Sequence, residues 1–300
     1  MMSLLRKEYQ RKNGTFFSTV VFTVLTALII SVFGNILTFF TGFRLYKEAD
    51  SVVIAAAAAY GLVSLISTFL CVLGTKYGNV SVLIMFATLG QIVLSSFYGL
   101  IFDSENNTFS LPVALGYLVT AAIVTLSFIE TNLREKEDGA KNKKVFILFC
   151  IALFFINGCA LPIFSLFTRL RPDYASNDFL TINSMFGLAY SGILLAVLYF
   201  FKVKKKFRDN CQSEICAEKK ARYGYALLLV ASYSLAYFAS DYLSLICTSL
   251  IPIVIQAPLS FSVSMIILIL FDFIIYKEKP SRINFIQVIL AVICTVCFAL

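Results

Sequence analysis

The sequence predicts an all-α polytopic membrane protein with nine transmembrane helices. Of its 300 residues, 59% are hydrophobic and only 14% are charged, which is more apolar surface than a water-soluble fold can bury. The charged residues gather in short stretches, and the apolar runs between them are about 20 residues long, the length that spans a bilayer core. Helices are expected because strands of a membrane barrel would be about 10 residues of alternating pattern.

Each predicted helix is an apolar run that ends where polar or charged residues begin. In chain order the nine runs are 15–41, 51–74, 79–102, 111–129, 145–168, 179–201, 223–246, 249–276 and 284–300. The stretches between them include TKYGN, DSENNT and YKEKPS. The first run is too long for the apolar part of a signal peptide, and no cleavage site followed by a soluble domain is present, so we expect it to stay in the mature chain.

The positive charges predict the orientation in the membrane. If the runs are all spans, 21 of the 25 lysines and arginines fall on one side, and the other side holds Arg44, Lys47, Arg169 and Arg171. By the positive-inside rule the richer side is cytoplasmic, and nine spans then place the C-terminus outside. We expect a multi-pass protein of the cell membrane, of bacterial plasma-membrane type.

The composition argues against several classes of function. The chain has no histidine, which excludes histidine-based catalysis and proton relays, and most of its eight cysteines lie inside apolar runs as small packing residues. Cys211 and Cys216 share a polar loop without further ligands, so we expect no metal, cofactor or catalytic site. The basic loop around them, KVKKKFRDNCQSEICAEKKAR, is expected to contact anionic lipid headgroups, and no module accompanies it for binding nucleic acid.

The chain contains a predicted internal repeat. A shift of 165 residues places TKYGNVSVLIMFATLGQ (75–91) on SDYLSLICTSLIPIVIQ (240–256), so that Tyr77 meets Tyr242 and Gln91 meets Gln256. The three runs from 51 to 129 then match the three from 223 to 300, and run 15–41 matches run 179–201 by position.

Run 145–168 has no partner in the first half, and the partner would stand just before residue 14, where LLRKEYQRKNG has the character of a helix tail. We therefore expect a bundle of five plus five helices that lacks most of its first helix. Its parts are a first repeat (1–130), a basic linker (131–144) and a second repeat (145–300). An odd number of helices in each repeat inserts the halves in opposite orientations, which is the architecture of secondary transporters.

The motifs of these runs resemble the drug/metabolite transporter superfamily, in its EamA-like branch. FINGCALPIFSLF (155–167) is similar to that family's opening helix, and LGQIVLSSFYGLIFDSENNT (89–108) to its fourth, although Ser96 stands where the family leads us to expect a proline. Residues 257–300, with Pro258 and the acidic turn at Glu278, are similar to its last two helices. The resemblance implies a transporter of small organic solutes that has no enzymatic activity.

Polar side chains inside apolar runs are the candidate site residues, because they are costly in lipid and usually face the bundle interior. For the solute cavity the candidates are Gln91, Gln256, Asn157, Tyr98, Asn183 and Tyr237. Each of them also fits a structural role as a hydrogen bond between helices. Asp241 lies inside its run and is the candidate for binding a coupling proton or cation, whereas Lys76, Glu105, Asp272 and Glu278 lie near the ends of runs and are expected at the membrane interface.

Two classes of function remain open from the sequence. The leading hypothesis is a secondary transporter of a metabolite, amino acid or drug-like molecule that works by alternating access, driven by a gradient because no nucleotide-binding loop is present. The alternative is a non-transporting or truncated integral membrane protein that has a structural or sensory role. An intramembrane enzyme is the weakest possibility, because the runs hold no arrangement of nucleophile and base.

Overall fold

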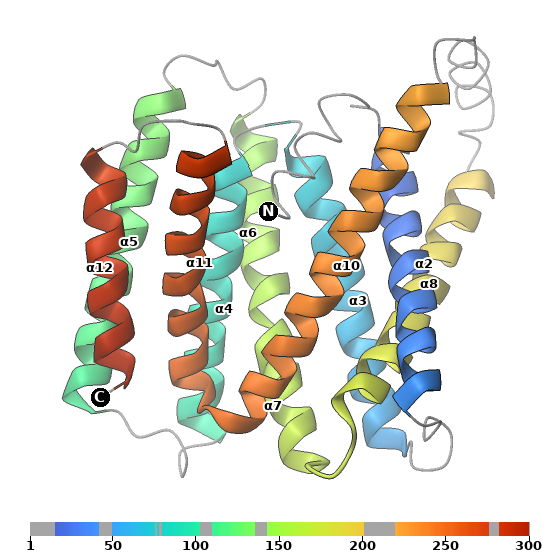
Figure 1. The fold of residues 1–300 in the computed structure, drawn as a ribbon, viewed down its shortest axis with the longest axis horizontal. Coiled ribbons are helices and arrows are strands. Elements are labelled where there is room, and N and C mark those ends of the chain that lie inside the picture. Colours follow the sequence, from blue (N-terminus) through green and yellow to red (C-terminus); the bar gives the residue numbers. More distant parts are fainter. Residues whose placement is uncertain are drawn as a thin grey trace. The chain divides into compact units, whose positions relative to one another are not determined.

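All nine predicted runs are helical in the computed structural model, which describes residues 16–41, 50–75, 77, 80–102, 110–135, 143–200, 220–275 and 282–299 (Figure 1). The helices of the first predicted repeat are α2 (Phe16–Thr41), α3 (Ser51–Gly74), α4 (Val80–Phe102) and α5 (Leu111–Glu135). Those of the second are α6 (Lys143–Gly158), α7 (Ala160–Leu170), α8 (Ser176–Phe200), α10 (Lys220–Leu250), α11 (Ile253–Ile275) and α12 (Arg282–Ala299).

The chain is a helical, multi-pass membrane protein. Within the described residues, five helical stretches are long and apolar enough to cross a bilayer: Thr19–Phe40, Ser51–Gly74, Val82–Phe102, Lys144–Leu170 and Ser176–Val197. Shorter apolar stretches lie at Leu111–Leu126, Ile253–Val263 and Phe285–Phe298. Many large apolar side chains on these helices are exposed, among them Phe39, Phe97 and Leu118, as expected for surfaces that face lipid.

The fifth predicted run is two helices rather than one. Pro162 has no N–H to donate to the carbonyl of Gly158, so the helical hydrogen-bond ladder is interrupted there. The turn is closed instead by the N–H of Cys159, which donates to Ile156 at 3.2 Å. α6 therefore ends at Gly158 and α7 begins at Ala160.

Prolines and helix-forming polar residues account for three other shifted boundaries: the end of α10, the start of α11 and the end of α5. α10 continues to Leu250, beyond the predicted 246, because Pro252 is the first residue that cannot extend it, and α11 begins directly after this proline. α5 continues to Glu135, beyond the predicted 129, since its last turns hold Leu, Arg and Glu, which favour helix whether or not they are apolar.

The helices form two compact units, each built from both halves of the sequence. The first unit comprises residues 77–169 and 246–300, hence α4, α5, α6, α11 and α12 with nearly all of α7. The second comprises residues up to 76 and 170–245, hence α2, α3, α8 and most of α10. These units differ from the predicted repeats 1–130 and 145–300, and those repeat boundaries stay a prediction.

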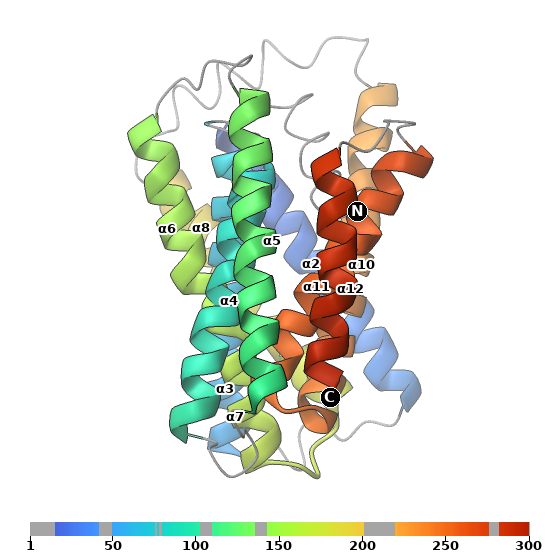
Figure 2. The ribbon, with the colours of Figure 1, turned by 90° about the vertical axis from the view of Figure 1, so that its left-hand side faces the viewer.

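In the first unit α4 and α6 pack against each other (Figures 1 and 2), and each has a glycine at the contact. A Cβ at Gly90 would lie 2.6 Å from the carbonyl carbon of Phe154, and a Cβ at Gly158 would lie 2.7 Å from the carbonyl oxygen of Gly90. Only glycine lets the two backbones approach this closely, and small residues serve the same purpose wherever helices pack in lipid.

A tyrosine connects α5 to the proline-containing part of α11 in the same unit. Pro258 lacks the N–H that would bond to the carbonyl of Val254. The Tyr117 hydroxyl donates to that carbonyl at 2.8 Å and also lies 2.6 Å from the Ser96 hydroxyl, whose other contact is the carbonyl of Ile92 at 2.5 Å. Ser96, at the position where a proline was expected, thus forms part of a polar contact among three helices.

In the second unit, α2, α3 and α8 pack closely against one another, whereas α10 contacts α2 through large side chains. Phe22, Val72, Val230 and Tyr233 form a fully buried cluster, with the rings of Phe22 and Tyr233 5.1 Å apart. A further pair, Phe33 and Phe238, meets edge to face at 5.4 Å. Aromatic pairs of this kind add about 0.5–1.5 kcal/mol beyond their buried area.

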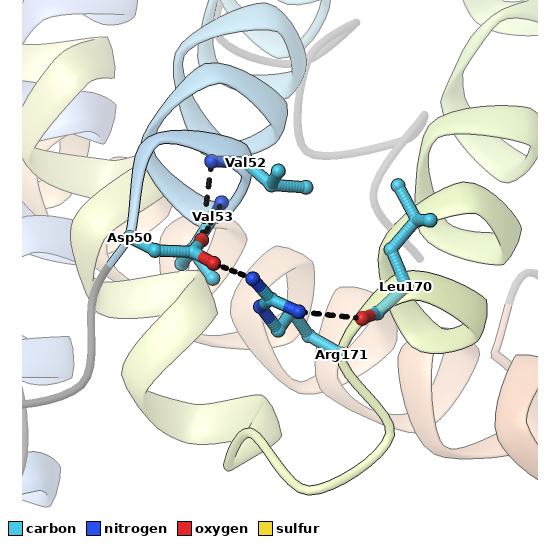
Figure 3. A network of polar contacts seen from close by, with 5 residues as sticks. All are labelled: Asp50, Val52, Val53, Leu170 and Arg171. Atoms are coloured by element: carbon cyan, nitrogen blue, oxygen red, sulfur yellow. Dashed lines mark hydrogen bonds and ion pairs between the residues drawn. The ribbon is translucent and has the colours of Figure 1, made fainter.

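The start of α3 is held by a capping aspartate (Figure 3). The Asp50 carboxylate accepts hydrogen bonds from the N–H groups of Val52 at 3.1 Å and Val53 at 3.0 Å. It also pairs with the guanidinium of Arg171, whose other nitrogen donates to the Leu170 carbonyl at 3.2 Å. The cap satisfies donors that have no partner at a helix N-terminus and joins α3 to the segment that precedes α8.

Candidate functional site

The second unit has a partly open cavity with a mixed polar and apolar lining. The centres of water molecules can occupy a volume of about 40 Å³ in it, so the cavity has room for about two or three water molecules. The lining residues come from α2, α3, α8 and α10: Thr23, Thr26, Ala27, Ile30, Gly61, Ser64, Leu65, Thr68, Leu180, Asn183, Ser184, Gly187, Tyr237, Phe238 and Asp241. Because hydroxyl, amide and carboxylate groups converge in an otherwise apolar bundle, this cavity is the candidate functional site.

Asp241 is the one acidic residue among the described residues of the lining, and it lies well inside α10. Its carboxylate accepts a hydrogen bond from the hydroxyl of Tyr60 on α3, a residue that is only 3% exposed. No lysine or arginine is among the described residues that line the cavity. A carboxylate in such surroundings needs a proton or a cation to offset its charge.

Tyr237 joins two of the helices that line the cavity. Its hydroxyl lies 3.1 Å from that of Ser64 on α3 and is also hydrogen bonded to Tyr60. α10 is therefore connected to α3 by a short chain of hydroxyl groups that ends at the Asp241 carboxylate.

Asn183 reaches the cavity from α8, at a point where α3 has a glycine. A Cβ at Gly61 would lie 3.0 Å from both the backbone and side-chain oxygens of Asn183, so glycine leaves the space that the amide fills. Nearby, the hydroxyl groups of Thr38 and Thr181 lie 2.8 Å apart and join α2 to α8. This part of the lining is therefore fixed in position by close packing.

Of the predicted site residues, Asn183, Tyr237 and Asp241 lie together in the lining of this cavity. The other four belong to the first unit and do not line it: Gln91 and Tyr98 on α4, Asn157 on α6 and Gln256 on α11. Gln256 is only 2% exposed, and the ring of Tyr98 packs against Phe102 at 5.5 Å. Lys76, Glu105 and Glu278 lie outside the described residues, as do Cys211 and Cys216.

Five hydroxyl residues of the lining were not among the predicted candidates: Thr23 and Thr26 on α2, Ser64 and Thr68 on α3, and Ser184 on α8. The sequence carries a signal for the first two of them. Thr19, Thr23 and Thr26 follow one another at spacings of four and three residues, which places their hydroxyls on one face of a helix.

Comparisons with known proteins support the fold and say nothing of a function. No family model matches the chain, and no curated protein matches it. Among the 27 matching chains of solved structures, one covers 99% of this chain and 93% of its own length, with a TM-score of 0.64 and 13% sequence identity. It is described only as the crystal structure of a protein, so the chain shares a whole-length helical fold with a structure of unstated activity.

Proposed function

We propose that this chain is a secondary transporter of a small organic solute, a member of the EamA-like branch of the drug/metabolite transporter superfamily. It lies in the cell membrane and works by alternating access between two inverted repeats. The basic loops face the cytoplasm and contact anionic lipid. The family and the transport activity are inferences from the sequence motifs, from the helical multi-pass fold and from the cavity of the second unit.

The grouping of the helices supports the predicted repeat. The repeat pairs α2 with α8, α3 with α10, α4 with α11 and α5 with α12. Each of these pairs lies within a single compact unit, apart from the last turns of α10. The first, third and fourth pairs are in direct contact, and the second is joined by the hydrogen bond between Ser64 and Tyr237. This pairing is what we expect if the two repeats pack around a shared twofold axis.

The observation that carries the proposal is the position of Asp241. A carboxylate that lines a polar cavity inside an apolar bundle is costly, and in membrane proteins such groups mark pathways for ions and substrates. As Asp241 changes between its charged and neutralised states, its interactions with Tyr60 and with whatever occupies the cavity change too. We propose that this change couples solute movement to a proton or cation gradient.

The test is solute flux in proteoliposomes that contain the purified full-length chain. Uptake of labelled amino acids, sugars, nucleosides and organic cations is measured with and without an imposed pH gradient. We expect Asp241→Asn, which keeps the shape of the side chain, to abolish gradient-driven uptake. Asp173→Asn is the matched control, because Asp173 is an exposed residue of the turn before α8 and does not line the cavity.

The same preparation tests the predicted solute cavity of the repeats. Gln91→Ala and Gln256→Ala are expected to lower the uptake rate without dissipating the gradient. If folded protein takes up every solute no faster than empty liposomes do, the transport proposal is contradicted. That result favours the alternative of a structural or sensory membrane protein.

A further inference from the structure

Two buried oxygen atoms that line the cavity of the second unit have no hydrogen-bond partner among the residues that the structure describes. They are the side-chain Oδ1 of Asn183, a residue that is 7% exposed, and the hydroxyl Oγ1 of Thr26, a residue that is 4% exposed. A buried polar atom without a partner costs about 1–3 kcal/mol. Both atoms therefore favour a bound group that supplies hydrogen-bond donors.

The charged oxygen group of the lining is the Asp241 carboxylate. It comes from α10, whereas Thr26 comes from α2 and Asn183 from α8, so three helices contribute one group each. A carboxylate and an amide oxygen only accept hydrogen bonds, and a threonine hydroxyl can accept them. These three oxygen groups match a ligand that has several hydrogen-bond donors and a positive charge.

A primary ammonium group has these properties, because it carries three N–H donors and one positive charge. The ring of Tyr237 and the ring of Phe238 also line the cavity, and aromatic faces attract cations. Ala27, Ile30 and Leu180 provide an apolar wall, and a Cβ added at Gly187 would meet no atom within 4 Å. The remaining space therefore suits a short alkyl chain.

We propose that this cavity binds the ammonium group of a small primary amine, with Asp241, Asn183 and Thr26 as its three acceptors. The proposal rests on the transport function above and specifies its substrate class. The volume of about 40 Å³ limits the part of the ligand that enters to a few non-hydrogen atoms, so the amine is short or only its amino end is enclosed.

The test is equilibrium binding of radiolabelled ethylammonium to the purified full-length chain in lipid nanodiscs. We expect saturable binding at one site for each chain. Unlabelled methylammonium competes with the label. Tetramethylammonium, which has the charge but no N–H donor, does not compete, and neither does Na⁺ at equal concentration. Equal competition by tetramethylammonium or by Na⁺ overturns the proposal, since the site then selects charge without hydrogen-bond donors.

Matched variants test the individual acceptors. Thr26→Val removes the hydroxyl and is expected to weaken ethylammonium binding about tenfold, whereas Thr26→Ser retains the hydroxyl and binds nearly as the natural chain does. Asn183→Ala and Asp241→Asn are expected to weaken binding about tenfold or more, because hydrogen bonds to a charged group are the stronger ones. Thr125→Val, an exposed threonine of α5 in the other unit, is the control that leaves binding unchanged.

Binding and flux separate the two proposals. Saturable ethylammonium binding without flux of any solute overturns transport and keeps the ammonium site. If an uncharged solute is transported, and ethylammonium neither inhibits that flux nor is transported itself, the ammonium site is overturned and the transport proposal stands. Unchanged binding in folded Thr26→Val and Asn183→Ala protein, as judged by circular dichroism, overturns the assignment of the acceptors.

Discussion

The close contact of α4 and α6 predicts that Gly90→Ala lowers the free energy of unfolding. The steric clash of the new Cβ costs more than the better helix propensity of alanine contributes. In the variant, the new Cβ would lie 2.6 Å from the carbonyl carbon and 2.9 Å from the Cα of Phe154. Carbon atoms pack best at about 3.5–4.0 Å, so α4 and α6 must separate by about 1 Å. The obstacle is backbone, which cannot rotate away as a side chain can.

A second glycine serves as the control that isolates the free-energy cost of the clash. Overpacking of this kind costs about 1–3 kcal/mol, whereas replacing a helical glycine by alanine otherwise gains about 0.5–1 kcal/mol. Gly192→Ala on α8 receives the same gain without the clash, because a Cβ there meets no atom within 4 Å. The propensity gain cancels in the comparison, so we expect the two variants to differ by about 1–3 kcal/mol in free energy of unfolding.

Unfolding by increasing SDS in mixed micelles measures this difference. Far-UV circular dichroism is the suitable signal, since the chain has no tryptophan. The midpoint is expected to fall for Gly90→Ala and to stay or rise for Gly192→Ala. If both variants unfold at the same SDS fraction, the close approach of α4 and α6 at Gly90 is not a feature of the folded protein.

Three further contacts give predictions for the same unfolding assay. Tyr117→Phe is expected to lower the free energy of unfolding by about 1–2 kcal/mol. The loss is smaller in a Pro258→Ala background, because residue 258 then has its own N–H for the Val254 carbonyl. An equal loss in both backgrounds contradicts this role of Tyr117. Thr38→Val and Thr181→Val are each expected to cost about 1 kcal/mol, and the double variant less than their sum, because both remove one shared hydrogen bond. Asp50→Ala is expected to cost about 1 kcal/mol through the lost cap of α3, whereas Asp50→Asn keeps the cap and costs only a few tenths, since exposed ion pairs contribute little.

The sequence predicted the helices well because hydropathy and length determine them in lipid. Run 51–74 coincides with α3, and runs 15–41 and 79–102 end at the residues where α2 and α4 end. Hydropathy does not register a break inside an apolar run, and it therefore missed the division of run 145–168 at Gly158. The local reason was visible in the sequence GCALP, where a proline follows a glycine by four residues.

The candidate site was predicted in part. Asn183, Tyr237 and Asp241 stood out because amide, phenol and carboxylate groups are rare in apolar runs. Thr26 and Ser64 did not, because their hydroxyls can bond to the carbonyl of the preceding turn and are common in membrane helices. Their role depends on which helices lie side by side, and the contact of α2 and α3 with α8 is a tertiary arrangement that no local pattern specifies.

The hydrogen bond from Tyr117 to Val254 has a mechanical consequence for α11. A helix that lacks one backbone hydrogen bond can bend at that position, and α11 lacks the hydrogen bond from residue 258 to the Val254 carbonyl. The Val254 carbonyl, which the proline leaves without its helical donor, accepts the hydrogen bond from Tyr117 on α5, so bending of α11 at this point requires that hydrogen bond to break first. The hydrogen bond that the proline makes possible therefore makes the contact between α5 and α11 more rigid. We expect any bending of the helices to occur in other segments.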